Sequence, residues 1–477
     1  MKLFTISPKD NVGVLLEPYQ TLSMGQKLAL APIKKGEKVI KYGYPIGVAT
    51  ADIQEGEWVH SHNMKTGLSG IEEYTYEPNI TPLAQQAPRT FKGYLRPDGK
   101  VGIRNEVWII PTVGCVTNIA KLLAEKASKD LPGNCEGVYS FPHPYGCSQL
   151  GDDQYNTQKI LSGLICHPNA AGVLVLGLGC ENNRIENLLK ACPEIQRENV
   201  RFLECQGCED EYEEGLKLLD ELKAIAAKQE RTEQPVSKLV VGLKCGGSDG
   251  FSGITANPLL GVFCDRLVAQ GGTTILTEVP EMFGAETLLM NRCVNEAIFD
   301  KTVSMINGFK RYFQSNNQPV YENPSPGNKD GGITTLEEKS LGCVQKGGTA
   351  PVSDVMEYGD HVSANGLLLM SGPGNDLVAA SGLAAAGAQV VLFTTGRGTP
   401  FGCPVPTVKV STNTKLAEKK KNWIDFNAGV LVDGVPMDQL CDEFYDMVIA
   451  LANGEIKAKN EQFEARDLAI FKTGVTL

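Results

Sequence analysis

Short hydrophobic runs separated by glycine and charged turns characterise the first 75 residues. The runs are GVLL (13–16), KVIKYG (38–43), IGVAT (46–50) and EWVHSHN (57–63), with turns such as IKKGEKV and IQEGEWV between them. Runs of this length bounded by turn residues are typical of β-strands. We therefore predict a small all-β domain over residues 1–75.

The pattern disappears in the next stretch. Residues 76–93, YEPNITPLAQQAPRTFKG, contain three prolines and show no hydrophobic period. Such a composition is typical of a linker that crosses a surface. We predict a flexible linker over residues 76–91, which would allow the first domain to close over the rest of the protein.

Beyond residue 92 the chain alternates between continuous apolar runs and helix-like stretches. The runs include VWIIPTVG (107–114), AGVLVLGLG (171–179), KLVVGLK (238–244) and TTILTEV (273–279), and later GLLLM and AQVVLFTTG. Apolar runs of this kind indicate strands that are buried on both faces, as in parallel α/β sheets. Residues 323–351 are rich in Gly, Pro and polar side chains. We therefore predict a multidomain α/β protein with α/β domains at 92–325 and 326–477, and a boundary or a long active-site loop near 325–350.

Composition and charge restrict the function. The chain has 477 residues, of which 42% are hydrophobic and 21% charged, and a net charge of -11. This charge argues against nucleic acid or an anionic membrane as partner, whereas local basic groups could still bind an anionic small molecule. No signal peptide or run of 18 apolar residues is found, so we expect a cytoplasmic protein. In that compartment the 14 cysteines suit core positions, iron ligation or catalysis better than disulfides.

Cysteines follow the predicted strands at the ends where ligands usually bind in parallel sheets. Cys115, Cys180 and Cys245 each come just after a buried run, at intervals of 65 residues, and Cys147 follows the short run GVYSF. The equal spacing suggests three similar stacked units, with coincidence as the alternative. Thiolates gathered at one edge could bind iron. The alternative is that each is a small buried hydrophobic residue.

Other polar residues in these regions suit an anionic substrate or proton transfer. His60 and His62 are two apart, so on a strand they would share one face and could bind a metal or transfer protons near neutral pH. Lys244, Asp249 and Arg397 also follow strands and could hold a carboxylate or exchange protons. A solvated edge strand and ordinary salt bridges are the respective alternatives. For the single CxxC at 205–208, the sequence favours a structural role over redox activity.

Five long motifs occur in order from residue 92 onward: GYLRPDGKVGIRNEVWIIPTVGC, FPHPYGCSQLGDD, LGLGCEN, GLKCGGSDGFSGITANP and GRGTPFGCPVPTVKVSTN. In this order they resemble the altronate and galactarate dehydratase family. The leading domain, with VHSHN, resembles the β-clip domain of the SAF type that precedes the catalytic region in that family. The resemblance therefore covers nearly the whole chain, and PTVGC leans toward the altronate members.

This resemblance implies dehydration of a hexonate or hexarate to a 2-keto-3-deoxy acid with ferrous iron, either mononuclear or in an iron–sulfur cluster. The positions that match the motifs of the family are the two histidines of VHSHN, the four strand-end cysteines, Asn257 and Arg397. We expect iron to polarise the substrate while Lys244 or a histidine moves protons. The full assignment is catalysis by His60, His62 and Lys244, substrate binding by Asn257, Arg397 and Asp249, and metal ligation by Cys115, Cys147, Cys180 and Cys245.

Other functions stay open at this point. Galactarate dehydration and sulfolactate sulfo-lyase activity are alternatives within related proteins. A non-catalytic sugar-acid binding protein is an alternative of another class, and would need no iron. An iron–sulfur redox protein is less well supported, because no dinucleotide fingerprint or further cysteine cluster accompanies the motifs. The expected partner is a sugar acid, and a homo-oligomer is compatible with the sequence.

Overall fold

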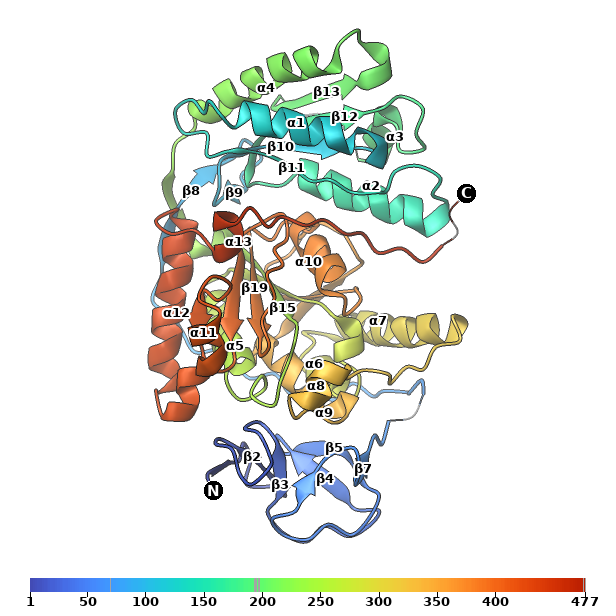
Figure 1. Cartoon of the computed structure of the whole chain (residues 1–477), viewed down its shortest axis with the longest axis vertical. Coiled ribbons are helices and arrows are strands. Elements are labelled where there is room, and N and C mark those ends of the chain that lie inside the picture. The colour runs from blue at the N-terminus through green and yellow to red at the C-terminus, as the bar shows by residue number, and fades with distance from the viewer. Residues whose placement is uncertain (69, 193–194, 196–197, 475, 477) are drawn as a thin grey trace.

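The computed structural model describes residues 1–68, 70–192, 195, 198–474 and 476. Its N-terminal part is the predicted small all-β unit, at the bottom of Figure 1. Gly36 and Gly56 lie in its charged turns with φ of 89° and 77°, a conformation that favours glycine. Two sheets form the unit, one of β1 (Leu3–Phe4), β2 (Val12–Leu15), β3 (Lys27–Ala29) and β6 (Trp58–Val59), the other of β4 (Lys38–Lys41), β5 (Tyr44–Ala49) and β7 (Met64–Lys65).

A four-stranded parallel sheet follows, at the top of Figure 1. Its strand order is β11-β10-β12-β13, and the apolar runs predicted at 107–114 and 171–179 supply its two central strands. The strands are β10 (Glu106–Pro111), β11 (Val138–Ser140), β12 (Ala170–Gly177) and β13 (Val200–Glu204). The helices between and after them are α1 (Thr117–Ala127), α2 (Gly151–Ile165), α3 (Ile185–Ala191) and α4 (Glu211–Ala227). A small three-stranded sheet of β8 (Thr90–Leu95), β9 (Val101–Gly102) and β14 (Thr232–Pro235) completes this part of the chain.

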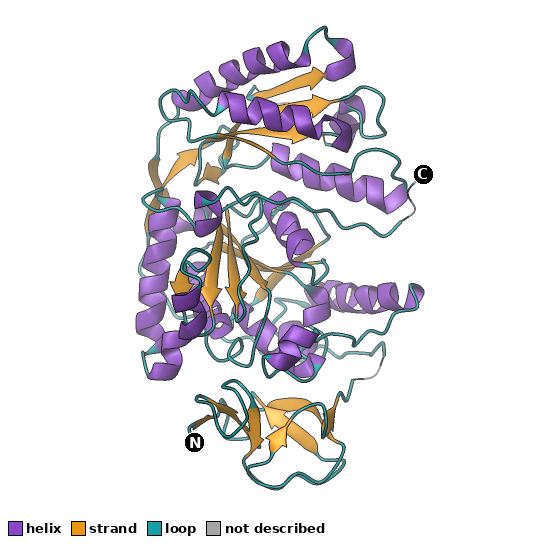
Figure 2. Ribbon diagram, viewed as in Figure 1, coloured by secondary structure: helices purple, strands orange, loops and turns teal. Residues whose placement is uncertain are grey.

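The rest of the chain forms a seven-stranded parallel sheet with helices on its faces (Figure 2). In order across the sheet its strands are β17 (Val352–Met356), β18 (Gly366–Met370), β16 (Thr273–Leu276), β15 (Val240–Cys245), β19 (Val390–Thr395), β20 (Thr407–Ser411) and β21 (Phe426–Asn427). The helices are α5 (Ala256–Ala269), α6 (Glu286–Met290), α7 (Glu296–Ser315), α8 (Pro326–Asp330), α9 (Leu336–Cys343), α10 (Asp376–Ala385), α11 (Thr414–Lys419), α12 (Met437–Ala452) and α13 (Lys459–Gln462).

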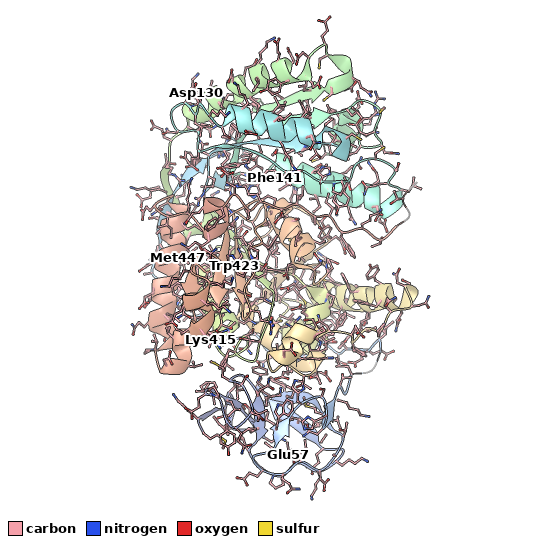
Figure 3. All side chains as sticks on the ribbon, viewed as in Figure 1. Glu57, Asp130, Phe141, Lys415, Trp423 and Met447 are labelled. Atoms are coloured by element: carbon pink, nitrogen blue, oxygen red, sulfur yellow. The ribbon has the colours of Figure 1, made fainter. Side chains whose placement is uncertain are left out.

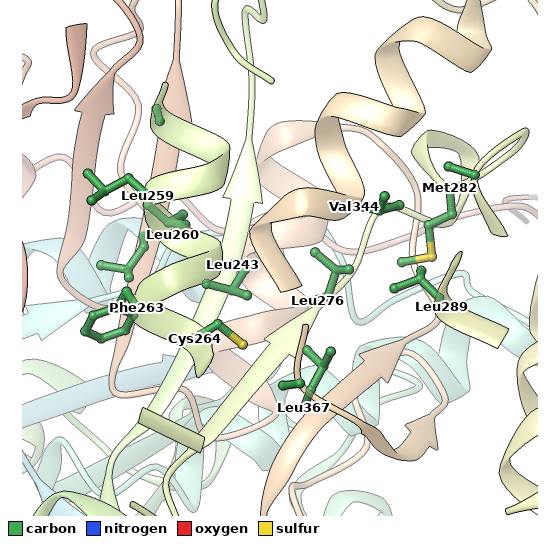
Figure 4. Packing of buried hydrophobic residues seen from close by; sticks show 14 of the residues in the cluster. Leu243, Leu259, Leu260, Phe263, Cys264, Leu276, Met282, Leu289, Val344 and Leu367 are labelled. Carbon is green, nitrogen blue, oxygen red and sulfur yellow. The ribbon is translucent and has the colours of Figure 1, made fainter. Parts of the chain in front are cut away.

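Continuous hydrophobic cores join these parts. Helices α2 and α10 pack between the two parallel sheets, and one core runs from Trp108 on the four-stranded sheet to Phe393 on the seven-stranded sheet. On the far face of the seven-stranded sheet α5 packs against β15 and β16, where Phe263, Leu243 and Leu276 meet (Figure 4). The same core includes buried side chains of the N-terminal unit. Side chains fill the space between the two sheets near Phe141 (Figure 3). Shared cores of this extent hold the two sheets in a fixed relation.

The described structure differs from two predictions made from the sequence about domain organisation. Strands on both sides of residue 325 belong to the seven-stranded sheet, so the expected boundary there falls inside one sheet. The change from one parallel sheet to the other lies between β13 and β15 instead. The 65-residue spacing of cysteines also does not mark three stacked units, because β10 and β12 are neighbours whereas β15 belongs to the other sheet. Among the described residues, no helix has the length and apolar character needed to cross a bilayer.

Candidate active site

Buried charges gather at the carboxyl edge of the seven-stranded sheet, which points toward the N-terminal unit in Figure 1. Lys244, the penultimate residue of β15, is fully buried and forms ion pairs with Glu278 and with Asp376, the latter at 2.9 Å. Lys346 approaches Glu278 from another direction, with a distance of 3.1 Å from Nζ to Oε2. One carboxylate therefore joins two ammonium groups in the interior.

Glu278 owes its position to an unusual backbone. It follows β16 with φ 73° and ψ 56°, the left-handed conformation that side chains other than glycine seldom adopt. The next residues form the short 3-10 helix η5 (Val279–Glu281), with Pro280 in its first turn. The backbone N–H of Cys245 donates to Glu278 Oε2 at 3.1 Å and so ties this turn to β15. Strained residues held by their surroundings are concentrated at functional sites.

Two thiols and a carboxylate beside these lysines could hold a metal ion. The ligand atoms of Cys245, Glu281 and Cys343 all lie within 4.8 Å of one another, and all three residues are buried. The two sulfur atoms are 3.4 Å apart, and Cys343 Sγ lies 3.0 Å from Glu281 Oε2. Lys346 Nζ also donates to Cys245 Sγ at 2.9 Å, so a bound ion would compete with this hydrogen bond. Thiolates and carboxylates together suit a borderline or soft divalent metal.

The pKa values follow from the mutual pairing of these charges. Burial opposes the charge on Lys244, but the carboxylates of Glu278 and Asp376 outweigh it and raise the Lys244 pKa. Burial also opposes ionisation of Glu281, yet Lys339, Lys244 and Lys346 lower its pKa to about 2. Its hydrogen bond with Cys245, followed by burial, raises the pKa of Cys343 well above the ordinary value. In the free protein Lys244 is thus a cation and a proton donor, while Cys343 is a neutral thiol.

The N-terminal unit is docked beside this cluster through a second set of buried charges. Lys27 and Lys41 each lie 2.9 Å from a carboxylate oxygen of Glu338 in α9. Burial opposes ionisation of Glu338, but the two ammonium groups lower its pKa to about 2. The predicted linker is also attached to the protein, since Tyr76 Oη donates to the carbonyl of Cys293 at 2.6 Å. The N-terminal unit is therefore fixed by specific contacts with α9.

The two histidines of the N-terminal unit do not share a strand face. Strand β6 ends at Val59, and His60 begins a turn because the Asn63 side chain accepts from the His60 N–H and donates to the Trp58 carbonyl. The prediction of an i, i+2 pair on one strand was therefore wrong, although both imidazoles lie against the Trp58 ring, at 5.1 and 4.8 Å between centroids. His62 is exposed.

His60 instead contacts helix α8. It is buried, with Nε2 3.1 Å from the carbonyl of Lys329 and Nδ1 3.0 Å from Ser61 Oγ. Burial, and secondarily Lys27, lowers the His60 pKa. Helix α8 also receives a hydrogen bond from Arg397 Nη1 to the Gly327 carbonyl, at 3.3 Å. Helix α8 thus lies between His60 and the loop that carries Arg397.

The three predicted substrate-binding residues differ in their surroundings. Arg397 is exposed, next to Gly247, where a Cβ would lie 3.4 Å from the Arg397 Cβ. Asp249 is buried and accepts hydrogen bonds from Thr412 Oγ1, at 2.9 and 3.0 Å. The Asn257 amide donates to the Gly342 carbonyl and accepts from Thr394. Only Arg397 has a side chain open to a ligand; Asp249 and Asn257 use theirs to position loops and α9.

The four predicted metal-binding cysteines fall into two places. Cys245 belongs to the buried cluster of the seven-stranded sheet. Cys115, Cys147 and Cys180 are exposed, and they follow strands of the four-stranded sheet. Figure 1 shows that β12 and β15 point in different directions. The expected single site with four thiolates is therefore not assembled, because the four cysteines follow strands of two different sheets.

Sequence reasoning missed most of the buried cluster. Glu278, Glu281, Lys339, Cys343 and Lys346 were not among the expected residues, although they form the ion pairs and hydrogen bonds that surround Lys244 and Cys245. The last three belong to the polar stretch that was predicted to be a boundary or an active-site loop. All eight residues of α9 are buried, despite the sequence LEEKSLGC. The charged residues in TEVPE and LEEKSLGCVQK could have drawn attention to these segments. Their pairing, however, depends on contacts between residues that are distant in sequence.

Comparison with known proteins agrees with this architecture. Three family models match the chain in order: "Altronate/galactarate dehydratase SAF domain" over residues 16–67, "D-galactarate dehydratase/Altronate hydrolase, second domain" over 93–227, and "D-galactarate/Altronate dehydratase, C-terminal" over 236–476. The chain belongs to the altronate/galactarate dehydratase family. The three matched ranges correspond to the N-terminal unit, the part with the four-stranded sheet and the part with the seven-stranded sheet.

Curated relatives in this family are similar over almost the whole chain. The altronate dehydratase of Bacillus subtilis is 54% identical over 98% of this chain and 94% of its own length, and that of Escherichia coli is 53% identical over the same shares. The galactarate dehydratase (L-threo-forming) of Escherichia coli is 32% identical over 96% of this chain and 91% of its own length. The family resemblance inferred from the motifs is confirmed.

Proposed function

We propose that this chain is an altronate dehydratase, a hydro-lyase that converts altronate to 2-dehydro-3-deoxygluconate. Full-length similarity above 50% to two altronate dehydratases supports this substrate, against 32% for a galactarate dehydratase. The structural observation that carries the proposal is the buried Lys244, Glu278 and Lys346 cluster at the carboxyl edge of the seven-stranded sheet. Ligands in parallel α/β proteins bind at this edge.

The chemistry of dehydration explains why buried ammonium groups are suited to this site. The proton at C2, next to the carboxylate, becomes acidic only if the enediolate formed on its removal is stabilised by positive charge. Lys244 and Lys346 are such charges, fixed before the substrate binds and surrounded by protein, where electrostatic interactions are stronger than in water. Lys244, kept protonated by its neighbours, is also the donor we assign to the hydroxyl that leaves C3.

The substrate would approach from the side of Asp376 and Arg397. Asp376, which pairs with Lys244, has a side chain that is 33% exposed, so it connects the buried lysine to solvent. The absence of a side chain at Gly246 makes room for the Asp376 carboxylate, because a Cβ at position 246 would lie 2.5 Å from an Asp376 oxygen. We assign binding of the sugar-acid carboxylate to Arg397, whose guanidinium can form two parallel hydrogen bonds with it. His62, exposed against Trp58, is the imidazole we assign to proton transfer.

Iron is the metal we propose for this family member. In the buried cluster Cys245, Glu281 and Cys343 would hold it, after Cys343 has lost its proton and Lys346 has released its hydrogen bond to Cys245. When bound there, a ferrous ion would supply Lewis acidity toward a carboxylate or hydroxyl oxygen. The ammonium groups nearby add positive charge, so loss of a lysine is expected to strengthen metal binding rather than weaken it.

The experiment that tests the function is a substrate panel with protein purified without oxygen and supplied with ferrous iron. Altronate, galactarate and sulfolactate are incubated separately, and 2-keto acid or sulfite formation is measured. We expect kcat/KM for altronate to exceed that for the other two by at least about 10²-fold, on the scale set by a site built to bind specific hydroxyls. Absence of keto acid from altronate would overturn the proposal.

A matched pair of arginine variants tests the assigned approach of the substrate. Arg397→Gln is expected to raise KM for altronate by about 10-fold or more, because a charge-assisted hydrogen bond is worth at least about 1.5 kcal/mol. Arg184→Gln serves as the control, since Arg184 is also exposed but lies at the start of α3. Equal KM values for the two variants would contradict the role of Arg397.

A further inference from the structure

Two thiols of the buried cluster are in direct contact. Cys245 ends β15 and Cys343 ends α9, and their sulfur atoms are 3.4 Å apart although the residues are 98 positions apart in the sequence. The two residues are 1% and 4% exposed. Three other buried thiols, those of Cys264, Cys293 and Cys403, each lie 3.0–3.3 Å from a threonine hydroxyl instead. A contact between two sulfur atoms is therefore not simply the way in which this protein buries a thiol.

The geometry of this contact is close to what a disulfide bond needs. A sulfur–sulfur bond is about 2.05 Å long, so the two atoms would have to approach each other by roughly 1.3 Å. A glycine adjoins each cysteine, Gly246 after Cys245 and Gly342 before Cys343, and glycine leaves the backbone freer than other residues do. Helix α9 also passes directly into the 3-10 helix η6 (Val344–Gly347) at this point. A rotation of the two side chains and a small backbone shift can thus bring the sulfur atoms together.

Each of the two sulfur atoms has a charged partner. Lys346 Nζ donates to Cys245 Sγ at 2.9 Å, and the Cys343 thiol donates to Glu281 Oε2 at 3.0 Å. A lysine beside a sulfur atom stabilises the negative charge that develops on it during a reaction. A thiol that donates its hydrogen to a carboxylate presents its sulfur lone pairs to its other neighbours. The arrangement therefore makes Cys245 the thiol that reacts first and Cys343 the thiol that follows.

The thiols are connected to the surface through Asp376. Lys244 Nζ donates to the Cys245 carbonyl at 2.6 Å and pairs with Asp376, whose side chain is 33% exposed. One lysine therefore separates Cys245 from a carboxylate that solvent reaches. Hydrogen peroxide is small and uncharged, so it can enter the interior at a lower cost than an ion. The side from which we expect the substrate to approach is also the side from which peroxide would arrive.

The CxxC pair, Cys205 and Cys208, is a less suitable place for such a bond. Both residues are half-buried. Burial, and then Glu211, raises the pKa of Cys205 to about 11, and the same two causes raise the pKa of Cys208. A redox-active CxxC has a lowered thiol pKa instead. This pair therefore provides an internal comparison for the buried pair.

We propose that Cys245 and Cys343 form a reversible disulfide bond when the protein meets a peroxide, and that this bond inactivates the buried site. First the Cys245 sulfur attacks one oxygen of hydrogen peroxide: a sulfur–oxygen bond forms, the oxygen–oxygen bond breaks, and the second oxygen leaves as water with the thiol proton. The Cys343 sulfur then attacks the sulfenic acid, and the sulfenic oxygen leaves as water with the proton of Cys343. Two thiols and one peroxide thus give one disulfide and two waters.

The bond would change contacts on which the proposed function depends. It removes the S–H donor from Glu281 Oε2 and the sulfur acceptor from Lys346. It also draws α9 toward β15, and with α9 it moves Lys339, which pairs with Glu281 at 2.9 Å. Both sulfur atoms are then lost to the metal proposed there. The inactivation rests on the proposed function, whereas formation of the bond does not.

The test uses reduced full-length protein that is freed of metal with chelator and treated with hydrogen peroxide. Remaining thiols are alkylated in denaturant, and peptides are mapped by mass spectrometry. We expect one peptide pair joined through Cys245 and Cys343, lighter by two hydrogen atoms than the reduced peptides and separated by dithiothreitol. After removal of peroxide and supply of ferrous iron, the treated protein should dehydrate altronate about 10²-fold more slowly, because active-site displacements near 1 Å have effects of this size. Dithiothreitol should restore the rate.

Variants separate the buried pair from the other thiols. Cys343→Ser should give no joined peptide, and its Cys245 should be oxidised to sulfinic or sulfonic acid, which dithiothreitol does not reverse. Cys245→Ser should also lack the joined peptide, so the test stands if one of the two variants does not fold. Cys208→Ser is the matched control, because it cannot close the CxxC pair. It should form the buried bond, and lose and regain activity as the wild type does.

Each outcome supports or overturns the disulfide. If Cys245 and Cys343 are still alkylated while other thiols are oxidised, the bond does not form and the proposal fails. A joined peptide with unchanged turnover would overturn its inactivating role. Loss of the peroxide effect in Cys208→Ser would place the responsible bond in the CxxC pair and overturn the proposal as well. Protein that forms the joined peptide but does not dehydrate altronate when reduced would support the bond and overturn only the proposed function.

Discussion

The two parallel sheets carry chemically different groups at equivalent edges. At the carboxyl edge of the seven-stranded sheet, Lys244, Glu278 and Lys346 are nearly or completely buried and pair with one another. At the carboxyl edge of the four-stranded sheet, Cys115, Cys147 and Cys180 are exposed. The first edge is covered by α8, α9 and the N-terminal unit, through contacts such as Lys27 with Glu338. The second has thiols that remain open to solvent.

This difference shows what the covering elements contribute. Buried ions are tolerated only when each has a partner, and they then act as fixed charges in a medium of low polarity. Exposed thiols need no partner for stability but can react with metals. The same strand-end position therefore supports preorganised electrostatics in one sheet and presents exposed thiols in the other.

The largest effect should come from unpairing the buried charges. Lys244→Met removes the cation that pairs with Asp376 and leaves Glu278 with Lys346 alone, and Glu278→Gln leaves two lysines with one carboxylate fewer. Each change should lower the free energy of unfolding by about 3–5 kcal/mol and reduce kcat/KM for altronate by about 10³-fold. Urea unfolding and steady-state kinetics measure the two quantities.

A double variant separates pairing from catalysis. Lys244→Met combined with Glu278→Gln removes opposite charges together, so it should be more stable than the sum of the single changes predicts, while remaining inactive. Lys190→Met is the control, because Lys190 is an exposed residue of α3. Additive stability losses would mean that Lys244 and Glu278 do not act as a pair.

The docking of the N-terminal unit should depend on pH through Glu338. Its pKa is lowered to about 2 in the folded protein from an ordinary value of 4.5, so the folded state binds its proton less readily than the unfolded state. This contribution to stability is complete above about pH 4.5 and is lost as the pH falls from 4.5 toward 2. Unfolding midpoints measured across this range should fall more steeply in the wild type than in Glu338→Gln.

The same variant should also be less stable near neutral pH, by about 3 kcal/mol, because Lys27 and Lys41 lose their shared partner. Faster hydrogen exchange should then appear in residues 1–68. Glu337→Gln is the matched control: Glu337 accepts from the Thr66 hydroxyl and from the Gly67 N–H without a lysine. If both variants show the same loss, the lysine pairing of Glu338 adds nothing to docking.

The sequence was sufficient to predict elements whose pattern is local. Continuous apolar runs correctly indicated β10, β12, β15 and β16, and polar turns with glycine indicated the N-terminal β unit. Strand ends correctly located Lys244, Cys245 and Arg397 in one region, because carboxyl ends of parallel strands meet. The family was also correctly inferred from motif order.

What failed depends on contacts that are distant in sequence. Residues 325–350 were interpreted as a boundary or a long active-site loop because they are rich in Gly, Pro and polar side chains, whereas Glu338 is buried between Lys27 and Lys41, about 300 positions away. His60 and His62 were placed on a strand because they continue a short run that follows a glycine turn, but the side chain of Asn63 closes a turn there. Neither a partner across the molecule nor a single side-chain turn produces a hydrophobic period.

Variants should distinguish the contribution of His60 to stability from that of His62 to catalysis. His60→Ala removes a hydrogen-bonding contact with the α8 backbone, so it should cost about 1–3 kcal/mol of stability as well as activity. His62→Ala changes an exposed residue and should alter stability by less than about 0.5 kcal/mol, yet lower turnover by about 10²-fold. Thermal unfolding and kcat measure the difference. His361→Ala is a control outside the N-terminal unit, and unchanged turnover in His62→Ala would remove that residue from the mechanism.

The smallest effect on stability is expected at the carboxyl edge of the four-stranded sheet. In protein freed of metal, Cys147→Ala should change the free energy of unfolding by less than about 0.5 kcal/mol, because an exposed thiol contributes little to packing. Cys343→Ala should cost about 1–3 kcal/mol, since it removes the shorter of two thiol hydrogen bonds to a buried oxygen of Glu281, at 3.0 Å against 3.4 Å from Cys245. Urea unfolding of both variants, in chelator and without oxygen, makes the comparison direct. A loss above 1 kcal/mol in Cys147→Ala would show that its thiol supports the fold, and the contrast between a buried edge of paired groups and an exposed edge that adds little stability would no longer hold.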